Sequence, residues 1–206
     1  MRLLQAREWQ VLPRSFVLSA LLWVIACEVA SSWIQGMDAL QQLWLLRAVE
    51  GLGLVGLMMY FDLARDIGLV AFNGRAWRCL LWLAVLAGTI GLLALAVFTS
   101  LRTWLILPDF VQGVSGLLLM LIAAPIVEEL LFRGVIYRLL REAFGVWLAI
   151  GLSALCFASI HGEIISPQLF GGLIFAWAYE YSRNLWVPTV LHIAGNSAIV
   201  ALAMLF

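Results

Sequence analysis

Residues 110–140 read FVQGVSGLLLMLIAAPIVEELLFRGVIYRLL, a long apolar run that is interrupted by Glu128, Glu129 and Arg133. A run of this length is sufficient for a helix to cross the hydrocarbon core of a membrane, which takes about 20 mainly apolar residues. An ionisable side chain at membrane depth is energetically costly, so each of the three is a candidate functional residue.

The whole chain has the composition of a membrane protein. Of its 206 residues, 65% are hydrophobic and 12% are charged, whereas an ordinary soluble domain is about 45–50% apolar and about 25% charged. The mean hydropathy is +1.04. Twelve basic and twelve acidic residues give a net charge of zero, so the chain lacks the basic footprint of a nucleic-acid-binding module. Disorder and a secreted disulfide scaffold are excluded by the same composition.

Seven apolar windows predict an all-α, polytopic bundle of transmembrane helices. They are Phe16–Ile34, Leu40–Phe61, Trp77–Phe98, Phe110–Phe132, Val146–Ile160, Leu169–Tyr181 and Leu185–Phe206. Because the fifth and sixth windows are short, six or eight crossings are also compatible with the pattern. No linker or repeat divides the chain, so we expect a single integral membrane domain over residues 1–206.

Arginines form four groups at every second connection between these windows, which puts all four groups on the same side of the membrane. They are Arg2, Arg7 and Arg14 before the first window, Arg65, Arg75 and Arg78 after the second, Arg138 and Arg141 after the fourth, and Arg183 after the sixth. Basic residues in short loops are retained on the cytoplasmic side of the membrane. The pattern therefore predicts a cytoplasmic N-terminus.

Glu129 and Arg133 are four residues apart, so on a helix they share a face and can form an ion pair that neutralises both. Glu128 is turned about 100° away and is left facing another surface. A purely structural alternative is that both acids reach the cytoplasmic interface and pair there with Arg133, Arg138 or Arg141.

The two histidines of the chain follow in later windows. His161 ends the stretch FASIH, residues 157–161, and His192 begins the stretch HIAGN, residues 192–196. His192 and Asn196 lie on one face of a helix. Either histidine alone could simply be hydrogen-bonded within a bundle. Together, an unpaired Glu, two His and an Asn on three separate windows supply a general base, its partner and oxyanion donors for a water-activating hydrolase.

The ordered set Glu128-Glu129-x-x-x-Arg133, Phe157-x-x-x-His161 and His192-x-x-x-Asn196 resembles the CPBP family of intramembrane proteases. That family includes the type II CAAX prenyl endopeptidases and the bacteriocin-processing or immunity proteins called Abi. The resemblance covers residues 110–206, which would form the catalytic core. The first three windows show no matching motif.

This resemblance implies a glutamate-type endopeptidase without a cofactor. Glu128 would activate the attacking water together with His161, and Glu129 and Arg133 would be a supporting pair. His192 and Asn196 would stabilise the oxyanion. The substrate would be a membrane-associated protein or peptide, processed as a CAAX motif or as a C-terminal sorting or anchor tail. We expect an integral protein of the bacterial inner membrane that contacts the lipid bilayer and no nucleic acid.

One geometric mismatch arises if Arg138 marks the cytoplasmic interface. Glu128 would then lie about 15 Å deep, whereas His161 would lie about 25 Å along a span that begins near Phe144. A tilted span or an earlier start to the fifth window would bring the two to the same depth.

Three other hypotheses stay open. A Glu and two His could hold a catalytic zinc ion, although no HExxH motif is present. Ser115, in the stretch GVSG at residues 113–116, resembles a rhomboid-type nucleophile, but it lies about 20 Å from Glu128 along the same helix. Finally, the chain could be a non-enzymatic scaffold or immunity protein. Glu28 and the Arg47/Glu50 pair show that charges lie within windows outside any motif, and we interpret them as structural.

Overall fold

The computed structural model describes residues 9–97, 111, 113–161 and 167–205, and these residues form helices and no strand. The helices are α1 (Arg14–Ser31), α2 (Ala39–Tyr60), α3 (Gly74–Val97), α4 (Val114–Leu118), α5 (Ala124–Leu131), α6 (Arg138–Ser159), α7 (Pro167–Ser182) and α8 (Trp186–Leu205). Two π-helical segments, Leu119–Ala123 and Phe132–Tyr137, join α4 to α5 and α5 to α6. The predicted all-α bundle is confirmed.

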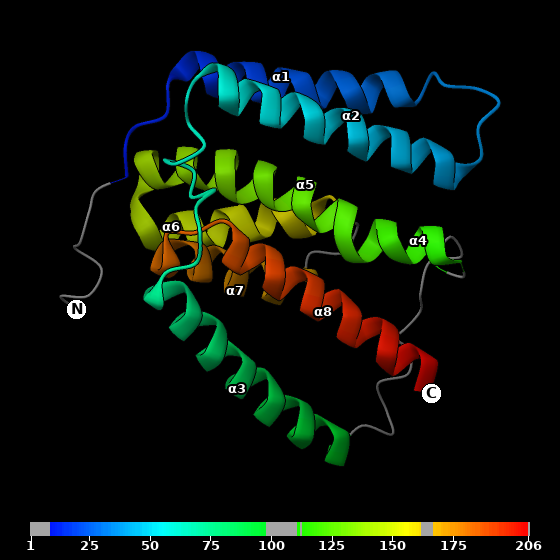
Figure 1. Ribbon diagram of the computed structural model, residues 1–206, viewed down its shortest axis with the longest axis vertical. Coiled ribbons are helices and arrows are strands. Elements are labelled where there is room, and N and C mark those ends of the chain that lie inside the picture. The colour runs from blue at the N-terminus through cyan, green and yellow to red at the C-terminus, as the bar shows by residue number, and fades with distance from the viewer. Residues whose placement is uncertain (1–8, 98–110, 112, 162–166, 206) are drawn as a thin grey trace.

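The helices run roughly side by side around α5 (Figure 1). α1 and α2 form a hairpin on one side, and α2 packs against α5. α8 packs against α5 from the other side, α6 and α7 form the most extensive helix pair, and α3 lies against α7 and α8. α5 is therefore enclosed by other helices, which is the position that a charged membrane-embedded segment requires.

α4, α5 and the first part of α6 form one continuous rod over Val114–Phe144, with both π-helical segments inside it. The predicted end of this helix at Phe132 is therefore wrong. The chain reverses only at Gly145, which has φ 78° and ψ 178°, a left-handed conformation that favours glycine. The reversal lies 17 residues after Glu128 and 16 before His161, so both are about 25 Å from it. Because the helix continues past Arg138, Glu128 and His161 lie at similar distances from the reversal; their depth in the membrane stays a prediction.

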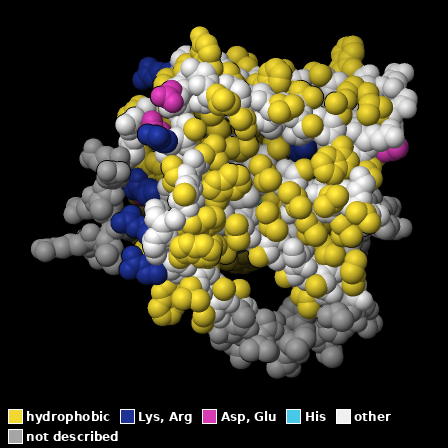
Figure 2. Space-filling model, in the orientation of Figure 1, with side chains coloured by type: hydrophobic (Ala, Val, Ile, Leu, Met, Phe, Trp, Pro, Cys, Tyr) yellow, Lys and Arg dark blue, Asp and Glu magenta, His cyan; other side chains and the backbone are white. Residues whose placement is uncertain are grey.

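Each of the seven predicted windows coincides with a helical rod. Four are long and apolar enough to cross a membrane: Arg14–Ser31, Ala39–Tyr60, Val114–Phe144 and Trp186–Met204. Val146–Ser159 is apolar but shorter. Large hydrophobic side chains such as Leu22, Leu52 and Leu81 are more than half exposed. Hydrophobic side chains cover much of the face of the molecule seen in Figure 2. Such an exterior suits lipid, and the chain is an integral membrane protein. The number of crossings stays a prediction.

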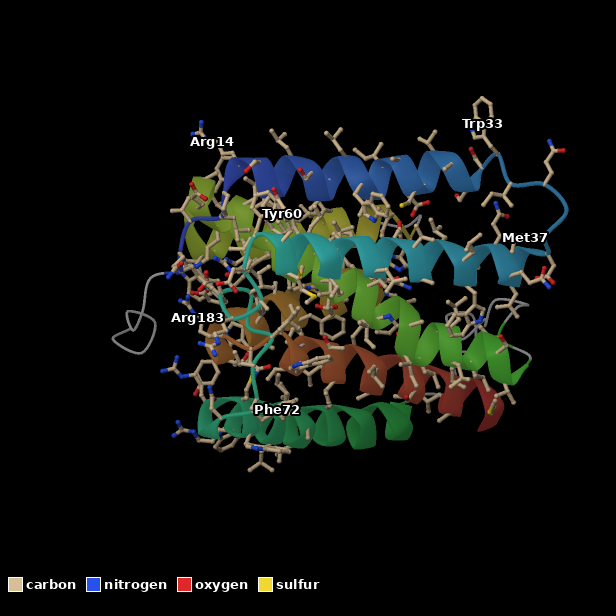
Figure 3. All side chains as sticks on the ribbon, turned by 45° about the horizontal axis from the view of Figure 1, so that its top comes forward. Arg14, Trp33, Met37, Tyr60, Phe72 and Arg183 are labelled. Atoms are coloured by element: carbon tan, nitrogen blue, oxygen red, sulfur yellow. The ribbon has the colours of Figure 1, made fainter. Side chains whose placement is uncertain are left out.

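Arginines gather at one end of the bundle (Figure 2). Arg14, Tyr60, Phe72 and Arg183 lie at this end, whereas Trp33 and Met37 lie at the opposite end (Figure 3). Arg2, Arg7 and Arg102 and the window ends Phe98, Phe110 and Phe206 lie outside the described residues. The alternation expected from the sequence therefore corresponds to one arginine-rich end of the fold.

Glu180 joins the helices at the arginine-rich end. Its carboxylate is 3% exposed and accepts hydrogen bonds from five donor atoms. These are Trp9 Nε1 at 2.8 Å, Tyr137 Oη at 2.9 Å, Arg141 Nε at 2.8 Å, Arg141 Nη2 at 3.0 Å and Arg183 Nη2 at 2.8 Å. One carboxylate thus connects the chain before α1 to α6, α7 and the loop after α7.

We expect the variant Glu180→Gln to lower the thermal stability of the purified protein. A neutral amide leaves Arg141 and Arg183 without their counterion, and removing one partner of a buried ion pair costs about 3–5 kcal/mol. The unfolding temperature in detergent should fall by roughly 10 °C. Glu142→Gln, at an exposed position of α6, is the matched control; an equal shift in both variants would contradict the account.

Candidate active site

The ion pair expected between Glu129 and Arg133 is present and fully buried. Arg133 Nη1 lies 3.0 Å from Glu129 Oε1, and both side chains are 0% exposed. Arg133 Nη2 donates a second hydrogen bond to the backbone oxygen of Gly172 on α7 at 3.1 Å. The structural alternative, in which Glu129 reaches the membrane interface, does not describe this fold.

Two aromatic rings enclose the guanidinium of Arg133. Its Cζ atom lies 4.9 Å from the ring centre of Phe157 on α6 and 5.3 Å from that of Phe175 on α7. A guanidinium over an aromatic face is stabilised electrostatically, most strongly when it is desolvated. A Cβ atom at Gly172 would lie 3.0 Å from Ala154 Cα, so glycine permits the close approach of α6 and α7 that forms this enclosure.

His192 lies between the two adjacent glutamates. Its Nδ1 is 2.9 Å from Glu129 Oε1, and its Nε2 is 3.7 Å from Glu128 Oε2. The ring stacks on Phe175, with 4.9 Å between centres and 24° between planes. A carboxylate accepts hydrogen bonds, so Nδ1 carries a proton and donates a hydrogen bond to Glu129. The other ring nitrogen, Nε2, then points toward Glu128. The first distance is a hydrogen bond, whereas the second is too long for one.

Glu128, 9% exposed, lines a cavity of about 540 Å³. Ile160 of α6 lines the same cavity, and so do Glu28, Arg47 and Glu50 from the α1–α2 hairpin. Ligand cavities in proteins are typically about 300–1,000 Å³. The carboxylate left unpaired by the ion pair of its neighbour thus faces a space that could hold a substrate.

Asn196 and His161 are held by backbone carbonyls. Asn196 Nδ2 donates to the oxygen of Met120, in the first π-helical segment, at 2.9 Å. His161 is exposed, and its Nδ1 donates to Phe157 O at 2.8 Å, which leaves Nε2 as a possible proton acceptor. The ring of Phe157 contacts both histidine rings. The distance between ring centres is 4.8 Å to His161 and 5.5 Å to His192. Among the described residues, no hydrogen bond or ion pair joins His161 to Glu128.

The π-helical segments bracket α5, which carries Glu128 and Glu129. Pro125 occupies the start of α5 and cannot donate a backbone hydrogen bond to the preceding turn. The wider π-helical turn of Leu119–Ala123 directly precedes it, a form of helix that is frequent at functional sites. The accepting carbonyl of Met120 comes from this turn.

Ser115 lies apart from these residues, where its Oγ accepts a hydrogen bond from Trp44 Nε1 at 2.9 Å. It is 13 residues from Glu128 on the same rod, so the two belong to different sites. Within the described part of the chain, no three His, Cys, Asp or Glu side chains are arranged to hold a metal ion.

Phe175 and Gly172 were not expected from the sequence. Both sit in an apolar stretch, LFGGLIF at residues 169–175, whose only distinguishing feature is a pair of glycines. Paired small residues indicate close helix packing, but they do not indicate which partner approaches or that a buried arginine lies beside them.

Comparison with known proteins finds matches for the C-terminal half of the chain. A family profile described as "Type II CAAX prenyl endopeptidase Rce1-like" matches residues 110–198. This range contains all six candidate site residues, Glu128, Glu129, Arg133, His161, His192 and Asn196. No solved structure shows significant similarity to the chain.

Two curated bacterial proteins are similar over a comparable length. YdiL of Bacillus subtilis (strain 168), named as a candidate membrane peptidase, is 28% identical over 99 residues. The membrane-embedded CAAX protease MroQ of Staphylococcus aureus (strain USA300) is 33% identical over 107 residues. The alignments cover 47% and 48% of this chain and 41% of each relative. Over residues 110–198, the chain is thus similar to the type II CAAX prenyl endopeptidases, and it spans less than half the length of the curated relatives it matches.

Proposed function

We propose that this protein is an intramembrane endopeptidase that hydrolyses a peptide bond with water activated by Glu128 and histidine. One observation carries the proposal: Glu129 fixes Nδ1 of His192 at 2.9 Å, so that Nε2 faces Glu128 across 3.7 Å at the wall of a cavity. A carboxylate and an imidazole directed at the same point form the arrangement that general-base catalysis needs.

The gap between Glu128 Oε2 and His192 Nε2 supports a bridging water. The two atoms are too far apart for a direct hydrogen bond, yet one water could contact both. Glu128 would remove a proton as the water attacks the substrate carbonyl. The same proton would then pass to the nitrogen of the departing amine, so that the carboxylate is restored at the end of the reaction.

Asn196 and His192 would stabilise the tetrahedral intermediate. Asn196 Nδ2 uses one of its two hydrogens for Met120, which leaves the second available to an oxyanion. His192 can donate from Nε2 only when its ring is doubly protonated, because Nδ1 donates to Glu129. His192 can therefore stabilise an oxyanion only after its Nε2 has received a proton. It would receive this proton if it helps Glu128 to deprotonate the water.

His161 keeps its proposed role as a second partner of Glu128. It lies next to Ile160, which lines the cavity, and one aromatic ring away from His192. Since Nδ1 is bound to a backbone carbonyl, Nε2 is the atom that would face a substrate.

The substrate would be a membrane-associated protein or peptide that enters the cavity from the bilayer or the cytoplasmic side. A prenylated CAAX motif and a C-terminal sorting or anchor tail are the two classes that we consider. The arginine-rich end would face the cytoplasm of a bacterium, with the N-terminus on that side.

Glu128→Gln should abolish cleavage. The amide has nearly the shape of the carboxylate but cannot accept a proton, and loss of a general base lowers the rate by roughly 10²- to 10⁴-fold. Cleavage of a membrane-anchored reporter library by the purified protein measures this, with unfolding temperature as the check on folding. Glu142→Gln is the control and should cleave like the wild type. Undiminished cleavage by a folded Glu128→Gln variant would refute the proposal.

A strong chelator should leave cleavage unchanged, because the proposed mechanism uses no metal ion. The same reporter assay is run before and after chelation and again after added zinc. If chelation stops cleavage and zinc restores it, then Glu128, His161 and His192 are metal ligands and the glutamate mechanism is wrong. If no reporter is cut under any condition, a scaffold function is favoured instead.

A further inference from the structure

The wall of the cavity opposite Glu128 carries a second set of charges. Glu28 on α1 and Arg47 and Glu50 on α2 line it, and all three lie outside the residues that match the family profile. From the sequence alone, they are interpreted as a self-neutralising structural group. The structure places them in the same cavity as the candidate general base.

Glu50 is only partly satisfied by this group. Its side chain is 1% exposed, and one oxygen, Oε2, is bound by Arg47 Nη1. The other oxygen, Oε1, is buried and accepts no hydrogen bond from an N–H or O–H donor of the described residues, while the carboxyl of Glu28 lies close enough to interact with that of Glu50. A buried polar atom without a partner is unusual in a folded protein and calls for an explanation such as a missing ligand.

Arg47 cannot neutralise the cavity by itself. It is shared between Glu50 and Glu28, whose Oε1 lies 3.6 Å from Arg47 Nη1. Three acidic side chains and one basic side chain line the space, so the formal charge is negative when the acids are ionised. In a poorly solvated cavity the field of an uncompensated charge is strong. Such a space favours a cation and disfavours an anionic group.

We propose that this cavity binds a cationic side chain of the substrate, an arginine or a lysine close to the cleaved bond, with Glu50 Oε1 as its acceptor. Glu28, with a side chain 51% exposed, would attract the cation at the mouth of the cavity. Glu50 is then a specificity-determining residue, and the adjacent peptide bond is held at Glu128. The inference rests on the proposed endopeptidase function for its biological meaning, but the binding step can be tested separately.

The cavity has room for this arrangement. Its volume of about 540 Å³ lies within the range of about 300–1,000 Å³ that small-molecule sites occupy. Apolar side chains, including Val24, Val127 and Leu131, form the rest of the lining. They would contact the apolar part of a long basic side chain while its charged end reaches Glu50.

Peptide binding tests the inference without cleavage. The probes are a capped apolar peptide with one central arginine and the same peptide with glutamine, titrated onto purified Glu128→Gln protein in detergent. We expect the arginine peptide to bind about tenfold more tightly. Adding Glu50→Gln should remove that preference without weakening the binding of the glutamine peptide. Adding Glu142→Gln instead should preserve the preference for the arginine peptide. Equal binding of the two peptides, or a preference that survives Glu50→Gln, would overturn the inference.

Cleavage then separates this inference from the proposed function. With active protein, Glu50→Gln should lower kcat/KM about tenfold for a reporter with a basic residue near the cleaved bond and leave a neutral reporter unchanged. An equal loss for both reporters would show that Glu50 is only structural. Selective binding without any cleavage would support the cation site and count against the endopeptidase.

If Glu50→Gln fails to fold, the variant Glu28→Gln at the mouth of the cavity tests the cation site in its place. Glu28→Gln should weaken the binding of the arginine peptide about threefold and leave the binding of the glutamine peptide unchanged. No change in selectivity in a folded Glu28→Gln variant, with Glu50→Gln unfolded, would assign this group to structure alone.

Discussion

The burial of Arg133 is the constraint on which the rest of the structure depends. A fully buried guanidinium on a transmembrane rod is tolerable only if its surroundings supply a counterion and acceptors. Glu129 supplies the charge from the same helix, and the backbone of Gly172 supplies an acceptor from α7. Phe157 and Phe175 cover its faces. The arginine therefore holds α6 and α7 against the π-helical segment Phe132–Tyr137 that carries it.

That convergence also builds the candidate active site. Glu129 Oε1 accepts from both Arg133 and His192, so the counterion of the arginine orients the imidazole. Phe175 contacts the same two side chains. Because Glu128 is adjacent to Glu129 but lies about 100° around the helix, it is free of the ion pair and faces the cavity. The structural Glu129–Arg133 ion pair and Glu128, the proposed general base, thus lie on adjacent turns of one helical rod.

Periodicity and apolar length predicted the seven helical rods and the Glu129–Arg133 pair, since both depend on neighbours in sequence. They did not predict that the fourth helix continues to Phe144, because Arg138, Arg141 and Glu142 resemble a polar loop. In the fold, Arg138 donates to the backbone of Gln10 before α1, and Arg141 donates to Glu180. The place of His192 between two glutamates and the convergence of Glu50 with Glu128 depend on how distant helices pack. Spacing along the chain carries no information on either contact.

The position of His192 between Glu128 and Glu129 can be measured directly, because the chain contains only two histidines. Protein labelled with ¹⁵N at histidine would give two imidazole spectra in detergent, and His161→Ala assigns them. The account predicts a protonated Nδ1 on His192 and a shift of its Nε2 resonance in Glu128→Gln, with the His161 resonances little changed. A His192 spectrum that is insensitive to Glu128→Gln, or an Nδ1 without a proton, would contradict it.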